Sequence, residues 1–191
     1  MALGKQAKTL TEAQEKAVLA YLSVGTNPQR NTVMFLLSVD AGLRAKEIAS
    51  IAWEMMTDAA GELTDEIRIT NKASKGRSGG IVFISKRLKT ALFELAQTRQ
   101  DLKGPVIVSN RGLGMNTQSV TNWFFALYKN LGFEGCSSHS GRRTAITKWA
   151  RKISCVGGSM RDVQSLARHS SLQMTQRYIE VSNDAMQKVV G

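Results

Sequence analysis

Apolar residues recur at helical spacing along most of the chain. Thr11 is placed as an N-cap, and Val18, Leu19 and Leu22 follow on one face, which predicts an amphipathic helix. Residues 29–41 are apolar nearly all round, so we expect a buried helix there. Helical patterns also cover residues 44–51, 86–100, 116–131, 139–152 and 159–167, a segment that begins at 170–171 and carries Tyr178, and a short tail at 183–190.

Residues 53–85 have a different pattern. Gly61 lies in a turn-rich segment, Ile67 and Ile69 alternate with polar residues, and residues 81–84 form a β-branched and aromatic run. Between these strand candidates, residues 71–80 are rich in glycine, serine and lysine, as expected for a hairpin loop. The chain is therefore predicted to be α+β, mainly α with a small antiparallel sheet.

The length of 191 residues allows one large domain with a sizeable core. We expect residues 1–9 to form a basic N-terminal arm or linker, residues 10–181 the main domain, and residues 182–191 a C-terminal tail helix. The aromatic residues Trp123, Phe125 and Tyr128 are expected to pack in the core or at its rim, not to form a platform for stacked bases.

The charge of the chain indicates an anionic partner. Lys and Arg number 26 against 15 Asp and Glu, a net charge of +11. Such an excess favours a polyanion, because bound cations neutralise phosphates and release counterions. A basic but merely solvated surface is the alternative reading.

The compartment is expected to be reducing. Cys136 and Cys155 are the only two cysteines, and they have neither a metal-ligand spacing nor the density of a disulfide framework. The chain has no apolar run near the roughly 20 residues that span a bilayer. The basic N-terminus is not followed by the apolar core of a signal peptide. We therefore expect a cytoplasmic protein without a membrane partner.

Two arginines are candidates for binding a phosphate. Arg44 and Arg142 each stand near the start of a predicted helix, and a guanidinium fork binds phosphate oxygens in a bidentate manner. If the two helix ends converge, both side chains reach one phosphodiester. Glu47 lies three residues after Arg44, so it either pairs with Arg44 in a purely structural way or also orients it.

The two histidines and one tyrosine supply groups for proton transfer and nucleophilic attack. His139 is three residues before Arg142, which places both on one helix face, and Tyr178 follows His169 by nine residues. A phenol with a pKa near 10 needs cationic neighbours or a base to act as a nucleophile, and these residues can supply both. Histidines that only cap helices or pack in the core are the alternative.

Attack of Tyr178 on the phosphorus of a phosphodiester would give a covalent phosphotyrosine and release a sugar hydroxyl. This leaving group needs a proton, and Lys75 on the predicted hairpin loop can deliver it. Lys72 and Arg77 compete for this role, and a solvated loop cation that contacts DNA is the alternative. The sequence contains no Mg²⁺ cluster, P-loop or zinc spacing. We expect neither a metal nor a cofactor, because a covalent phosphotyrosine conserves the energy of the phosphodiester bond.

Five features follow one another along the chain: AGLRAKEI, a lysine on a hairpin, HSGRR, LARHSS, and a tyrosine nine residues after the last histidine. This ordered set resembles the catalytic domain of the tyrosine recombinases, the phage integrase family. The resemblance covers about residues 10–178. It implies a mainly helical catalytic domain with a three-stranded sheet. The implied catalytic residues are Arg44, Lys75, His139, Arg142, His169 and the nucleophile Tyr178.

The resemblance also implies a reaction and an assembly. A recombinase of this family forms a 3′-phosphotyrosyl DNA intermediate without a cofactor and exchanges strands through a Holliday junction. The partner implied is double-stranded DNA, bound by a homo-tetramer on paired sites and by a monomer or weak oligomer without DNA. The tail after Tyr178 is expected to dock on a neighbouring subunit.

The sequence departs from the family pattern at several positions. Gly141 and Arg143 flank Arg142 where leucine and histidine are usual, and Ala167–Arg168 precedes His169 where leucine–glycine is usual. We expect Arg143 and Arg168, with Lys72 and Arg77, to contact DNA. An N-terminal clamp domain is missing, so the chain is expected to be a fragment or a naturally short form.

Two other functions remain open: a type IB topoisomerase-like enzyme that relaxes DNA, and a catalytically silent DNA-binding regulator of the same fold.

Overall fold

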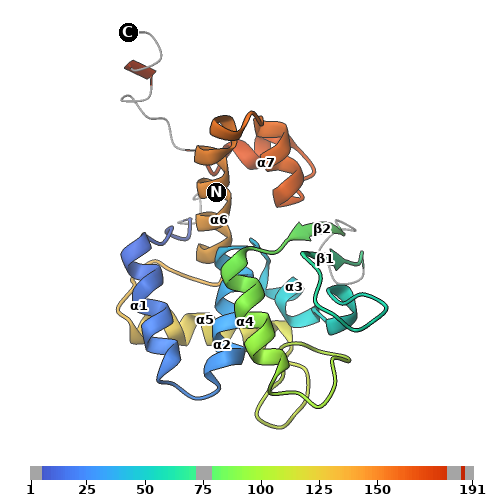
Figure 1. The fold of residues 1–191 in the computed structure, drawn as a ribbon. Helices are drawn as coiled ribbons and strands as arrows, with labels where there is room; N and C mark the ends of the chain where they lie inside the picture. The colour runs from blue at the N-terminus through green and yellow to red at the C-terminus, as the bar shows by residue number, and fades with distance from the viewer. Residues whose placement is uncertain (1–5, 72–78, 180–185, 188–191) are drawn as a thin grey trace. The chain divides into compact units, whose positions relative to one another are not determined.

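The computed structural model describes residues 6–71, 79–179 and 186–187. The chain forms two compact units, Met1–Ala145 and Ile146–Gly191, and their boundary falls inside helix α6, Ser140–Lys152. The predicted fold class is confirmed, since the described residues are mainly helical and include a small antiparallel sheet (Figure 1). The sequence had not indicated the division into two units. None of the described helices is long and apolar enough to cross a membrane.

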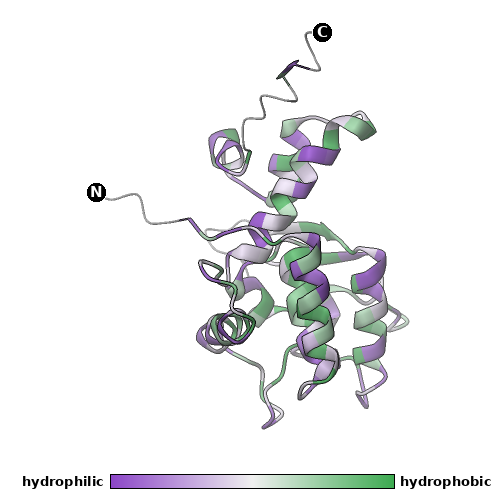
Figure 2. Ribbon diagram, turned by 90° about the vertical axis from the view of Figure 1, so that its left-hand side faces the viewer, coloured by the Kyte–Doolittle hydropathy of each residue, from purple (hydrophilic) through white to green (hydrophobic). Residues whose placement is uncertain are grey.

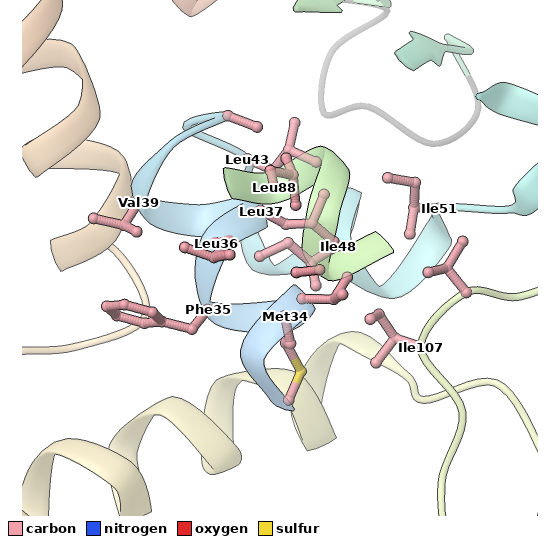
Figure 3. Close-up of a cluster of buried hydrophobic side chains, with 14 of the residues drawn as sticks. Met34, Phe35, Leu36, Leu37, Val39, Leu43, Ile48, Ile51, Leu88 and Ile107 are labelled. Carbon is pink, nitrogen blue, oxygen red and sulfur yellow. The ribbon is translucent and has the colours of Figure 1, made fainter. Parts of the chain in front are cut away.

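The first unit is organised around one buried helix. Its helices are α1 Glu12–Ser23, α2 Pro28–Val39, α3 Ala45–Ser50, α4 Lys86–Ala96, α5 Thr117–Asn130 and the first part of α6, with a 3₁₀ turn at Trp53–Met55. Every residue from Val33 to Val39 is buried, and α2 packs against both α1 and α4. Leu43, Ile48, Leu88 and Ile107 close around it (Figure 3). The prediction of a buried helix over residues 29–41 is confirmed.

Three other helices of this unit, α1, α4 and α5, are capped by short polar side chains. Figure 2 shows hydrophobic and hydrophilic residues alternating along them. Thr11 Oγ1 accepts the Gln14 N–H at 3.2 Å, and Gln14 Oε1 accepts the Thr11 N–H at 2.9 Å, which confirms the predicted N-cap. Ser85 caps α4 and Asn116 caps α5 in the same way. These side chains satisfy backbone donors that the helix itself leaves without partners.

The sheet is a hairpin of β1, Glu66–Ile69, and β2, Gly80–Phe83, with Ile67 opposite Val82. The alternation predicted for this segment holds, because Ile67, Ile69 and Val82 are buried and Phe83 is exposed. The resemblance implies three strands; among the described residues the sheet has two, and the segment before β1 has one isolated antiparallel bridge, between Thr57 and Leu63. Asp58 Oδ1 accepts two backbone N–H groups inside this turn, which leaves little length for a strand.

The aromatic residues of α5 follow the packing prediction with one exception. Tyr128 is buried, and Trp123 packs edge-on against Phe124 with ring centroids 4.9 Å apart. Phe125 is 63% exposed, so the prediction of a core or rim position is wrong for this residue. It occupies the outer face of an amphipathic helix, where no apolar neighbour covers most of its ring.

The second unit consists of the rest of α6, a 3₁₀ turn at Ile153–Val156, and two short helices, α7 Met160–Ala167 and α8 Leu172–Gln176. Ile146, Val163 and Ala167 form its small core, and Tyr178 packs against them. Tyr178 was predicted on a helix, but α8 ends before it. The Tyr178 N–H bonds back to the Thr175 carbonyl at 3.0 Å, in a turn that follows the helix. The predicted tail helix lies outside the described residues, except for Met186 and Gln187.

A close contact between two helices of the first unit explains one departure from the family pattern. An added Cβ at Gly141, at the start of α6, would lie 2.2 Å from Ser38 Oγ and 2.8 Å from Ser38 Cβ on α2. Ser38 is fully buried, so its side chain has no space to withdraw. The contact therefore requires glycine at position 141.

We expect Gly141→Ala to lower the free energy of unfolding by about 1–3 kcal/mol, the usual cost of overpacking a core. Denaturant unfolding measures this change. The loss should be smaller when the substitution is made in Ser38→Gly, which removes both clashing atoms, and should persist in Ser38→Ala, which retains Cβ. A Gly141→Ala protein as stable as the parent would mean that the two helices can separate at no cost.

Candidate active site

The candidate residues of the first unit lie around the end of α2. Gly42 has φ +62°, a left-handed conformation that favours glycine, and the Leu43 N–H bonds back to the Leu37 carbonyl at 2.9 Å. This turn ends α2, and α3 begins after Arg44, which is its N-cap residue. The candidate arginine thus occupies a fixed position between two helices.

Arg44 is held by Glu47, as the sequence suggested. Arg44 Nη1 donates to Glu47 Oε1 at 2.9 Å, and the Arg44 backbone N–H donates to Glu47 Oε2 at 2.8 Å. The Glu47 side chain is fully buried, whereas that of Arg44 is 20% exposed. The predicted pairing is therefore present, and it fixes the backbone and the guanidinium of Arg44 together.

Arg142 reaches the same turn from α6. Its Nη1 donates a hydrogen bond to the carbonyl of Gly42, two residues before Arg44. Arg142 is only 3% exposed, so its side chain can adopt few other positions. The condition stated from the sequence, that the two helix starts converge, is met, with Arg142 bonded to the turn that carries Arg44.

His139 and Arg143 flank this arginine. The helix begins at Ser140, one residue later than predicted, so His139 precedes it; the His139 carbonyl accepts the Arg143 N–H at 3.0 Å. The His139 N–H donates to Ser137 Oγ at 3.3 Å. His139 is exposed. Arg143 is half-buried and donates from Nη1 to Gln6 Oε1 in the N-terminal arm.

The second unit brings His169 and Tyr178 together. Their rings stack with centroids 5.3 Å apart and an angle of 25° between the planes. His169 Nδ1 lies 3.0 Å from Thr175 Oγ1, and Thr147 Oγ1 donates to the Tyr178 carbonyl at 3.2 Å. The imidazole and the phenol are therefore neighbours, each with its position fixed by a threonine.

Thr175 is a functional candidate that the sequence analysis missed. It is fully buried on a five-residue helix, and it is the buried residue of that helix. If its hydroxyl donates to Nδ1, the proton of a neutral His169 is on Nε2; if it accepts, Nε2 has the lone pair. The signal available was a threonine between the histidine and the tyrosine, which is too common a pattern to single out.

Arg168 has an unusual backbone. It ends α7 with φ +52° and ψ +46°, the left-handed conformation that glycine adopts without steric cost. The family pattern usually has glycine here, and this chain retains the conformation with an arginine. Arg168 and His169 are both buried, at 9% and 7% exposed. Because the His169 N–H bonds to the Gln164 carbonyl at 3.1 Å, the turn sets the position of the histidine.

Three predicted site residues, Lys72, Lys75 and Arg77, lie outside the described residues. Among the described residues, the first unit brings Arg44, Glu47 and Arg142 together, and the second brings His169 and Tyr178 together. Guanidinium forks bind anionic oxygens, and a phenol beside an imidazole can lose a proton. In that part of the chain, no group of three or more His, Cys, Asp or Glu side chains could hold a metal ion.

Comparisons with known proteins show which proteins this chain is similar to. The XerC tyrosine recombinase of Pelobacter propionicus is 30% identical over 152 residues, which is 78% of this chain and 47% of that protein. The chain spans about half the length of the curated relatives it matches.

Solved structures show the same fold. XerA recombinase superposes with a TM-score of 0.70 at 20% identity, covering 99% of this chain and 64% of XerA. The XerH site-specific recombinase, solved bound to its difH substrate before cleavage, superposes with a TM-score of 0.72 at 15% identity, covering 100% of this chain and 55% of XerH.

A model of the phage integrase family matches residues 8–184, nearly the whole chain. The chain belongs to the phage integrase family.

Proposed function

We propose that this chain is the catalytic domain of a site-specific DNA recombinase that cleaves and rejoins DNA through a 3′-phosphotyrosyl intermediate. The observation that carries the proposal is the stacking of Tyr178 on His169, centroids 5.3 Å apart, on a turn fixed by Thr147 and Thr175. A tyrosine in such a position is a candidate nucleophile with an imidazole ring beside it.

The reaction needs each predicted residue in a defined role. Tyr178 Oη attacks phosphorus while the bond from phosphorus to the 5′ oxygen breaks, and the phenolic proton passes to His139 or His169. Arg44 and Arg142 bind the nonbridging oxygens, where negative charge grows in the transition state. Lys75 protonates the leaving 5′ oxygen, with Lys72 as the alternative donor. Rejoining is the reverse reaction with a new 5′ hydroxyl.

The partner we propose is double-stranded DNA. The net charge of +11 suits a polyanion, and the related XerH was solved on its DNA substrate. We assign backbone contacts to Arg143 and Arg168, together with Lys72 and Arg77. The active assembly is a homo-tetramer on paired DNA sites, in which the tail after Tyr178 docks on a neighbouring subunit. Without DNA the chain is a monomer or weak oligomer. The reaction takes place in the cytoplasm and uses no cofactor.

The first test is a suicide-substrate assay. We expect the parent chain, but not Tyr178→Phe, to form a covalent adduct with nicked duplexes that lose the leaving strand, because the phenylalanine ring has no nucleophilic oxygen. Denaturing gels detect the adduct. Since the native site is unknown, the substrate is a pool of sequences from which reacting duplexes are recovered.

Two results would contradict the proposal. A parent chain that binds DNA without forming an adduct, when a longer chain that includes a clamp domain also forms none, would indicate a silent DNA-binding regulator. Adducts whose only outcome is relaxation of supercoiled DNA, with no exchange between two duplexes, would indicate a topoisomerase-like enzyme. Tyr21→Phe is the matched control, because Tyr21 lies on α1 and should not affect the adduct.

The role of Glu47 gives a second expectation. Glu47→Gln preserves the size of the side chain but removes the charge that pairs with Arg44, so we expect adduct formation to slow by at least about tenfold through misplacement of the guanidinium. Single-turnover rates at saturating DNA measure this effect. Glu66→Gln is the control, because Glu66 pairs with Arg68 on the hairpin. Equal rates for the two variants would reduce Glu47 to a structural residue.

Affinity should depend steeply on salt. If binding neutralises backbone phosphates, log K falls linearly with log salt, with a slope of about −0.9 for each phosphate contacted. Fluorescence anisotropy of labelled duplex between low and physiological salt measures the slope. A slope near zero would contradict phosphate-based DNA binding.

A further inference from the structure

Asp40, the residue that follows α2, is held by an arginine from another helix. Arg87 on α4 donates from Nε to Asp40 Oδ2 at 2.7 Å and from Nη2 to Asp40 Oδ1, a bidentate fork. Ser85 Oγ, which also caps α4, donates to the same Asp40 Oδ2 at 2.6 Å. Asp40 is 9% exposed at its side chain, so the carboxylate is nearly enclosed by these partners.

The fork also includes a third helix. Arg87 Nη2 donates to Glu15 Oε2 on α1 at 2.9 Å, and the Glu15 side chain is 4% exposed. The hydrogen bond to Asp40 raises the pKa of Arg87, and the bond to Glu15 raises it further against the opposing effect of burial. The guanidinium therefore joins α1, the end of α2 and the first turn of α4.

This cluster stands at one end of the turn that carries the two candidate arginines. Asp40 precedes Gly42, whose carbonyl accepts Arg142, and Arg44 follows. At the other end of the turn, Glu47 holds Arg44. The five residues from Asp40 to Arg44 are thus fixed at both ends by ion pairs, with Arg87 forming the one at the α2 end.

We propose that Arg87, acting through Asp40, is a positioning residue for Arg44 and Arg142. The inference rests on the proposed function, since it assigns Arg87 the task of holding these guanidinium groups where the scissile phosphate binds. A fork fixes direction as well as distance, because both N–H···O bonds lie in one plane. A displacement of about 1 Å at a site of reaction can cost about 100-fold in rate.

The test compares Arg87→Met with Lys89→Met. Lys89 is on the same helix, its side chain is 44% exposed against 43% for Arg87, and it pairs with Asp65. Both substitutions remove one positive charge, so any loss of general attraction to DNA is matched. The measurement is the single-turnover rate of adduct formation at saturating DNA, on a duplex recovered from the pool assay.

We expect Arg87→Met to slow adduct formation at least about tenfold, with DNA affinity within about twofold of the parent, and Lys89→Met to react like the parent. A second substrate tests the cause. A methylphosphonate at the scissile position has a methyl group in place of one nonbridging oxygen, so it is neutral and presents only one oxygen to the arginine pair. The deficit of Arg87→Met should therefore shrink to within about threefold there.

Three results would overturn the inference. Equal rates for the two variants would show that Arg87 does not position the pair. A deficit of the same size on both substrates would assign Arg87 a general structural role. A parent chain that forms no adduct would contradict the proposed function and, with it, the inference. This third result is recognised from the parent chain alone, whereas the first two require the variants. Thermal unfolding checks that each variant is folded. If Arg87→Met does not fold, Arg87→Lys, which retains the charge but cannot form the fork, should show the same substrate dependence.

Discussion

The site in the first unit depends on how α2 ends. A buried guanidinium needs hydrogen-bond acceptors, and Arg142, at 3% exposed, obtains one from the Gly42 carbonyl. That carbonyl is accessible only because Gly42 adopts φ +62° and turns the chain out of the helix. The approach of α6 that brings Arg142 to this turn in turn requires Gly141 against Ser38. One helix end thus determines where both arginines lie.

The sequence predicted most of this fold because its signals are local. Thr11 as N-cap, the buried α2 and the alternation of Ile67 and Ile69 each follow from periodicity or capping within a few residues. The Arg44–Glu47 pair was foreseeable for the same reason. The contacts of Arg142 with Gly42 and of Arg87 with Asp40 were not, since they join residues 100 and 47 positions apart and no spacing rule encodes them.

The second unit shows the opposite balance. Its core is small, and the helices α7 and α8 are short, so local hydrogen bonds have to fix what packing cannot. The end of α8 before Tyr178 was missed because residues 172–177, LQMTQR, continue to suit a helix in sequence. Arg168 shows how a departure from a family pattern can be read physically: the left-handed turn before His169 is retained, and the arginine accepts a conformation that glycine would adopt without steric cost.

The chain uses one chemical group for two tasks. Carboxylates and phosphates both present two oxygens in a plane, so the guanidinium geometry that holds Asp40 is the geometry proposed for the phosphodiester. Lysine could supply the charge in either place but not the direction, because an ammonium rotates freely about its stem. An arginine that must present a fixed plane to its substrate needs a backbone that does not rotate beneath it. Two contacts meet that requirement. The Arg87 fork holds the Asp40 carboxylate at one end of the Asp40–Arg44 turn, and Glu47 holds both the backbone N–H and the guanidinium of Arg44 at the other.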